Sequence, residues 1–169
     1  MAAPMLTSRE RILALLTEEP GLHLRELPRR LGISLRAVRY HLDTLGDEAV
    51  VTPHRSGRFE RWFPARTFSA DERALISALR VRGQRAILTC LLKEGPATVA
   101  NIKKATRLAA PALHRDLDYL AADRLIEVGS ERLYRLHDLD RTRMRLAMYR
   151  QRYPDLLADA AQEIFEETR

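Results

Sequence analysis

The chain has 169 residues, of which 46% are hydrophobic and 31% are charged, so we expect a folded chain with room for one medium domain or two small ones. Its net charge of +6 and its pI of about 10.0 favour polyanionic partners, nucleic acid first and acidic membrane surfaces second. The single cysteine, Cys90, excludes an internal disulfide and fits a reducing compartment, and no apolar run predicts a membrane span.

Three helices are predicted in the first part of the chain. Thr7 and Glu10 form a capping box before the first helix, and the residues EEPG predict its end. A second helix is expected to stop at a tight turn at Gly32. Ser34 is a good N-cap for the third helix. The inner face of this third helix is predicted to hold four residues at helical spacing, Leu35, Val38, Leu42 and Leu45.

A β-hairpin is predicted after the third helix. The segments VVTPH and FERWF read as strands, and RSG joins them. Gly57 in this turn can take a positive φ without a side-chain penalty. We expect the aromatic residues Phe59, Trp62 and Phe63 to pack within the hairpin and the core. The hairpin is also basic, through Arg55, Arg58 and Arg61.

A connecting helix is predicted across residues 67–83. Ser69 and Glu72 form a second capping box, and apolar residues follow on one side: Leu75, Ile76 and Leu79. Packing between domains and contact with a second copy of the chain are both open roles for this helix.

The pattern of the first part then repeats at an offset of 75 residues. Val38, Leu42 and Leu45 of the first copy meet Leu113, Leu117 and Leu120 of the second. A long period that occurs twice indicates two copies of one small domain, because a solenoid needs at least three stacked units.

The last segment, residues 138–169, has its own apolar stripe. Pro154 is expected to start this helix or to kink a longer one. The stripe must be buried against the second domain or against another chain. It consists of Leu156, Leu157, Ala160, Ala161, Ile164 and Phe165.

The order helix, helix, turn, helix, hairpin resembles the winged helix-turn-helix domain of prokaryotic transcriptional regulators, including ArsR-like and MarR-like proteins. The resemblance covers residues 8–64 and 85–137, and the tandem arrangement resembles archaeal regulators with two such domains. It implies a mainly α fold with small β-hairpin wings (α+β) and a C-terminal helix. The implied segments are 1–66 (first domain), 67–83 (connecting helix), 84–137 (second domain) and 138–169 (C-terminal helical segment).

The resemblance implies that the helix at 34–45 enters the major groove of double-stranded DNA. The wing, at 52–61, would then contact the minor groove or the backbone. Arginine can donate two hydrogen bonds to guanine, and Ser, Thr or Tyr can reach phosphates. A solvated basic face is the alternative for the same residues. The expected contacts are Ser34, Arg36, Arg39, Tyr40, His41, Thr44, Arg55, Ser56 and Arg58.

The second copy departs from the first in its third helix, AAPALHRDLDYL, where Pro111 suits the first turn. We expect an outer face of His114, Arg115, Asp116, Asp118 and Tyr119, with little net charge. Weak DNA binding, protein binding and support of the first domain all stay open for this copy. Its candidate DNA contacts are Lys103, Lys104, His114, Arg115 and Arg132.

No motif for catalysis, cofactor binding or metal binding is present in the sequence, and we expect Cys90 to be a core residue. The sequence therefore predicts a non-enzymatic, sequence-specific regulator of transcription, located in the cytoplasm of a prokaryote on the nucleoid. We expect a homodimer formed through the connecting or C-terminal helices. The alternative is a tandem winged-helix module that binds proteins or coats DNA without reading bases.

Overall fold

The structure is a computed structural model that describes residues 5–158. Within them the chain is mainly helical with two small antiparallel sheets, which confirms the expected α+β class. The chain divides into two compact units, Met1–Arg73 and Ala74–Arg169, and each is described by itself.

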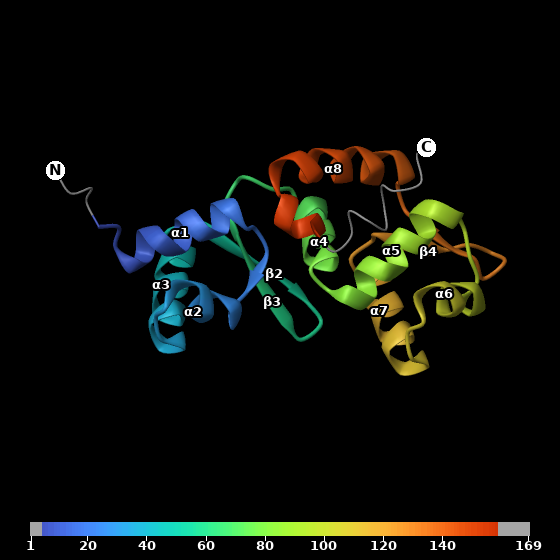
Figure 1. The fold of residues 1–169 in the computed structure, drawn as a ribbon, viewed down its shortest axis with the longest axis horizontal. Helices are drawn as coiled ribbons and strands as arrows, with labels where there is room; N and C mark the ends of the chain where they lie inside the picture. Colours follow the sequence, from blue (N-terminus) through green and yellow to red (C-terminus); the bar gives the residue numbers. More distant parts are fainter. Residues whose placement is uncertain (1–4, 159–169) are drawn as a thin grey trace. The chain divides into compact units, whose positions relative to one another are not determined.

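Between residues 5 and 64, the first unit contains three helices and three strands (Figure 1). The predicted capping box is confirmed. The Thr7 hydroxyl accepts a hydrogen bond from the backbone N–H of Glu10, and the Glu10 carboxylate accepts a hydrogen bond from the backbone N–H of Thr7. Gly32 ends the second helix with φ +66°. The elements are α1 (Ser8–Glu18), β1 (Leu22–His23), α2 (Glu26–Leu31), α3 (Leu35–Asp47), β2 (Val51–Ser56) and β3 (Phe59–Pro64).

The sheet of the first unit has three strands in the order β1-β3-β2, all antiparallel, where the sequence predicted only the hairpin. Ser56 pairs with Phe59, so the turn contains only Gly57 and Arg58. Gly57 has φ +58°, as its predicted role in the turn requires. We call β2, β3 and this turn the wing.

The core of the first unit is formed by one side of each helix and by the sheet. Trp62 and Phe63 of β3 are buried, as expected. Leu35 is an exception to the predicted inner face of α3, because 43% of its surface is exposed. It occupies the first position of the helix, where no preceding turn covers it. The buried cluster consists of Ile12, Leu16, Leu22, Leu27, Leu31, Val38, Leu42, Leu45, Val51 and Trp62.

Helix α4 (Ala70–Leu79) begins at the predicted capping box of Ser69 and Glu72. All residues from 74 to 79 are buried, which is a wider buried surface than the single apolar side predicted for this helix. Helix α4 crosses the boundary between the two units after Arg73. The elements that follow it in the second unit are α5 (Arg82–Glu94), α6 (Val99–Thr106), α7 (Ala110–Ala122), β4 (Ile126–Val128), β5 (Tyr134–Leu136) and α8 (Leu139–Arg152).

The backbone of the second unit follows that of the first at the offset of 75 residues. Helices α3 and α7 both have 13 residues and start 75 residues apart. Left-handed backbone conformations recur at the same offset, at Gly32 and Arg107, Ala49 and Arg124, and Gly57 and Arg132. The second hairpin is shorter, with three residues in each strand.

The C-terminal segment is described up to residue 158. Helix α8 ends before Tyr153, and residues 154–158 are again helical, as the expectation for Pro154 allowed. Leu156 and Leu157 of the predicted stripe are buried, whereas Ala160, Ala161, Ile164 and Phe165 lie outside the described residues. No helix within residues 5–158 has the length and apolar character needed to cross a bilayer.

Candidate nucleic-acid interface

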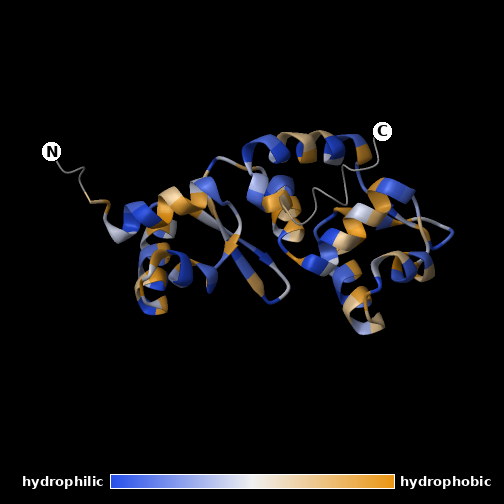
Figure 2. Cartoon of the chain, viewed as in Figure 1, coloured by the Kyte–Doolittle hydropathy of each residue, from blue (hydrophilic) through white to orange (hydrophobic). Residues whose placement is uncertain are grey.

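Helix α3 has two sides of opposite character, which Figure 2 shows as alternating hydrophobic and hydrophilic colours. Val38, Leu42 and Leu45 point into the core and are at most 1% exposed. Arg36 and Arg39 are exposed on the other side. We call this exposed surface of α3 the recognition face; it consists of Leu35, Arg36, Arg39, Tyr40, Asp43 and Asp47.

Three of the polar residues predicted to contact DNA from α3 also serve the helix itself. The Ser34 hydroxyl caps α3 by accepting a hydrogen bond of 3.1 Å from the N–H of Ala37. Thr44 Oγ1 donates to the carbonyl of Tyr40 at 3.0 Å. His41 is half-buried, and its ring lies edge-on to that of Tyr40 with centroids 5.4 Å apart. Tyr40 itself is 67% exposed, so its hydroxyl is available to a partner.

The wing places two exposed arginines beside its turn. Arg55 Nε donates to Glu60 Oε1 at 2.8 Å, so the carboxylate partly neutralises this guanidinium. The Arg58 guanidinium lies over the ring of Phe59, 5.5 Å from its centroid. Ser56 is half-buried at the end of β2. The tip of the wing is therefore cationic but carries an internal counter-charge.

A cavity of about 190 Å³ lies between α3 and the wing. Arg39 and Asp43 line it from the helix, and Arg55 and Glu60 line it from the strands. The sequence analysis did not single out Asp43, although its position four residues after Arg39 puts both on one side of a helix. The surface that would face DNA thus carries two arginines and two carboxylates around one depression.

Arg61 is a correction to the sequence analysis, which grouped it with the exposed arginines of the hairpin. It lies within β3 and is only 8% exposed. Its Nη1 atom donates to the carbonyl of Gly21 at 3.0 Å and lies 3.6 Å from Glu26 Oε2. Burial lowers the pKa of Arg61, and the Glu26 carboxylate opposes that shift. Arg61 therefore ties the sheet to the segment before α2 and is not available to DNA.

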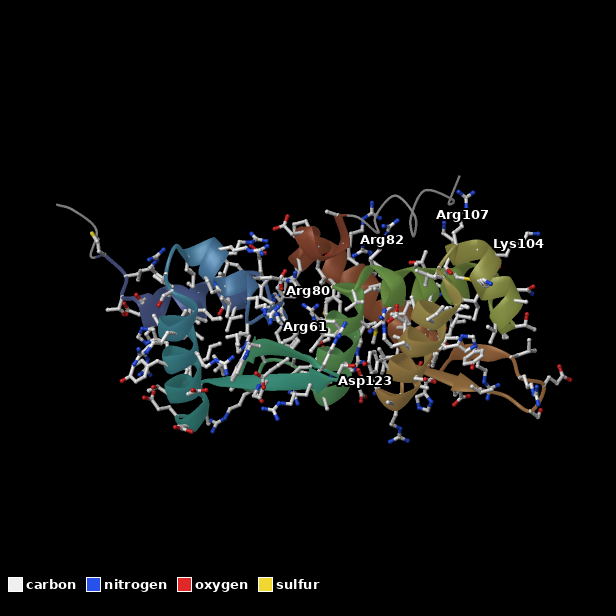
Figure 3. The ribbon with its side chains drawn as sticks, turned by 90° about the horizontal axis from the view of Figure 1, so that it is seen from below. Arg61, Arg80, Arg82, Lys104, Arg107 and Asp123 are labelled. Carbon is white, nitrogen blue, oxygen red and sulfur yellow. The ribbon has the colours of Figure 1, made fainter. Side chains whose placement is uncertain are left out.

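The candidate contacts of the second unit are all exposed. Lys104 projects from α6 together with Arg107, which ends this helix (Figure 3). His114 lies on α7, where its Nδ1 atom is 2.8 Å from the carbonyl of Ala110. The remaining exposed candidates are Lys103, Arg115 and Arg132.

Asp116 is not on the outer face of α7, where the sequence analysis placed it. It is 2% exposed, and its Oδ1 atom accepts a hydrogen bond of 3.3 Å from Arg115 Nη2. Its carboxylate lies against Gly83 in the first turn of α5, where the helix dipole favours negative charge. With Asp116 inside, the outer face of α7 is less acidic than the sequence suggested.

Among the described residues, the other titratable groups form neither a reactive thiol site nor a metal site. Cys90 is 7% exposed, as expected of a core residue, and burial raises the pKa of its thiol. Across residues 5–158, no three residues of the types His, Cys, Asp and Glu lie close enough together to hold a metal ion.

Within residues 5–64 the first unit has three helices, and the third exposes arginines next to a basic hairpin. This arrangement defines a helix-turn-helix domain. Residues 6–76 match a family model described as an N-terminal HTH domain. This match covers the first unit and supports DNA binding by it. No curated protein matches the chain.

Proposed function

We propose that the chain is a transcriptional regulator that binds double-stranded DNA sequence-specifically. Helix α3 enters the major groove in this proposal, and the wing contacts the minor groove or the backbone. The observation that carries the proposal is the division of α3 into a buried apolar side and an exposed side with Arg36, Arg39 and Tyr40. The HTH match over residues 6–76 supports it, since this class inserts its second motif helix into the groove.

Three exposed residues of α3 have roles in DNA binding that their chemistry suits. Arg39 donates two hydrogen bonds to guanine O6 and N7, because its fork-shaped guanidinium fits this pair of acceptors. Arg36 reads a neighbouring base or a phosphate, and the Tyr40 hydroxyl donates to a phosphate. Arg55 and Arg58 in the wing neutralise the backbone and supply affinity that depends on salt.

We further propose that the second unit is a second winged-helix domain, so that the chain is a tandem regulator of the archaeal type within the ArsR/MarR-like superfamily. The equal lengths of α3 and α7 and the recurrence of left-handed residues at the offset of 75 support this. Lys103 and Lys104 would contact the DNA backbone. The proposed segments stay 1–66, 67–83, 84–137 and 138–169.

A homodimer formed through α4, through the C-terminal segment or through both completes the proposal. Met144 and Met148, one turn apart on α8, are 67% and 45% exposed and offer apolar surface to a second copy. Two copies of α3 would then address half-sites separated by about 34 Å or a multiple of that distance. The dimer would work on the nucleoid in the cytoplasm and would catalyse no reaction.

Selection of duplexes from a random library by the purified full chain tests this proposal. A reproducible motif is the expected result, and its preference at one base pair should be lost with Arg39→Ala and kept with Arg29→Ala on α2. Arg29 is a matched control because it is also an exposed arginine on a helix of the first unit. Binding without any preferred sequence contradicts the proposal.

A module that binds proteins or coats DNA is the second candidate function. The mixed charge of the exposed residues of α7, with His114 and Arg115 next to Asp118, favours it for the second unit. This function predicts salt-sensitive binding to every duplex and no enriched motif in the same selection.

A further inference from the structure

Leu35 is an aliphatic side chain within the recognition face, whose other exposed residues are Arg36, Arg39, Tyr40, Asp43 and Asp47. It is 43% exposed in the first turn of α3. Arg39 follows four residues later, so both side chains lie on the same side of the helix. The bond from the Ala37 N–H to the Ser34 hydroxyl fixes the backbone at this end of the helix. Leu35 is thus held in place at the end of α3 that approaches base edges in helix-turn-helix domains.

The chemistry of the major groove limits what Leu35 can recognise. Base edges there present hydrogen-bond donors and acceptors to polar side chains, and a leucine can use none of them. The apolar feature of these edges is the C5-methyl group of thymine. A contact between this methyl group and Leu35 would remove apolar surface from water on both sides. A thymine at the base pair that Leu35 contacts therefore strengthens binding. A cytosine or a purine at that position lacks the methyl group and does not strengthen it.

We propose that Leu35 is a specificity-determining residue that contacts the C5-methyl group of a thymine, beside the base pair that Arg39 reads. This inference rests on the proposed function, because it requires α3 to lie in the major groove. In the second unit the residue at the same offset is Ala110, which is shorter and half-buried. The thymine contact accordingly belongs to the first unit.

Replacement of thymine by uracil tests the contact directly, since uracil lacks the C5-methyl group and keeps every hydrogen-bonding atom. Each thymine of the selected motif is changed to uracil in turn, and the affinity of the full chain is measured by fluorescence anisotropy. At one position the wild-type chain should lose about fourfold in affinity, the value for one buried methyl group. Leu35→Ala should bind the thymine and uracil duplexes equally at that position.

Val128→Ala serves as the matched control, because Val128 is 51% exposed on β4 in the second unit. It should show the same fourfold response to uracil as the wild type. Circular dichroism of Leu35→Ala should show the wild-type helix content and melting temperature. A motif without thymine, or a uracil response that Leu35→Ala retains, overturns this inference and leaves the proposed function standing. If the selection yields no motif, the proposed function fails and this inference fails with it.

Discussion

The carboxylate of Asp116 fills the space that a side chain on Gly83 would need. A Cβ atom at Gly83 would lie 2.1 Å from Asp116 Oδ2 and 3.2 Å from Cγ, well inside van der Waals contact. The first turn of α5 and the middle of α7 therefore approach each other only because residue 83 is glycine. This contact sets how α7, the counterpart of α3, is held in the second unit.

Gly83→Ala should destabilise the protein by about 1–3 kcal/mol, as other overpacked sites do. Urea unfolding followed by circular dichroism measures this free energy of unfolding. Gly46→Ala is the matched control within a helix, because its added Cβ would meet only Trp62 Cζ3 at 3.9 Å. That change should stabilise the protein by about 0.5–1 kcal/mol through helix propensity. An unchanged or raised stability of Gly83→Ala would show that the two helices are not packed as described.

Arg107→Gly should raise the stability of the second unit. Arg107 ends α6 with φ +57°, a conformation that costs a residue with a Cβ about 1–2 kcal/mol and glycine nothing. The larger conformational entropy of glycine in the unfolded chain offsets part of this gain. We therefore expect the free energy of unfolding to rise by about 0.5–1 kcal/mol. Thermal unfolding measures the effect. Lys104→Gly, inside the same helix, should lower the melting temperature instead, and a lower melting temperature for Arg107→Gly would refute the argument.

The stability of the first unit should fall as the pH falls below about 6.5, the ordinary pKa of histidine. His23 Nδ1 accepts a hydrogen bond of 3.2 Å from the N–H of Arg25, which a protonated ring cannot accept. Burial lowers the pKa of His23, and the Arg61 cation lowers it further. As the pH falls, the unfolded chain therefore takes up the proton at a higher pH than the folded chain does. The free energy of unfolding decreases over this range, until the pH is below the pKa of His23 in the folded chain.

Urea midpoints between pH 8 and pH 5 check this dependence. The wild type should lose more stability over this range than His23→Gln, which has no ring to protonate. Parallel curves for the two proteins would rule out His23 as the source.

Asp43→Asn and Glu60→Gln should each tighten binding to any duplex about three- to tenfold at low salt. Both carboxylates line the cavity between α3 and the wing, where phosphates would approach, and Glu60 holds Arg55 at 2.8 Å. The gain should shrink as salt is added, because the effect is electrostatic. Anisotropy titrations at several salt concentrations measure it. The control Glu18→Gln removes an exposed carboxylate of α1 and should change little, and weaker binding by Asp43→Asn would contradict the proposed position of the DNA.

The sequence was sufficient to predict elements whose signals are local. The spacing of Val38, Leu42 and Leu45 determines the buried side of α3, and Ser34 determines its start. The turn at Gly57 was predictable for the same reason, because a single residue type fits a left-handed position in a short hairpin.

Features that depend on distant contacts were not predictable. Arg61 and Asp116 were placed outside because charged residues are rarely buried unless paired. Their burial depends on the carbonyl of Gly21 and on the space left by Gly83, each more than 30 residues away in the sequence. Leu35 was assigned to the core from its spacing alone, which takes no account of where the helix begins.

The ratio of affinities for the selected duplex and a scrambled duplex tests the central claim most directly. For the wild-type chain at physiological salt, this ratio should be on the order of 10³ or more. Arg39→Ala should lower it by about 10- to 100-fold, the effect of losing one bidentate contact with a guanine. A wild-type ratio near one, or a ratio that Arg39→Ala leaves unchanged, would contradict base reading by Arg39 from α3.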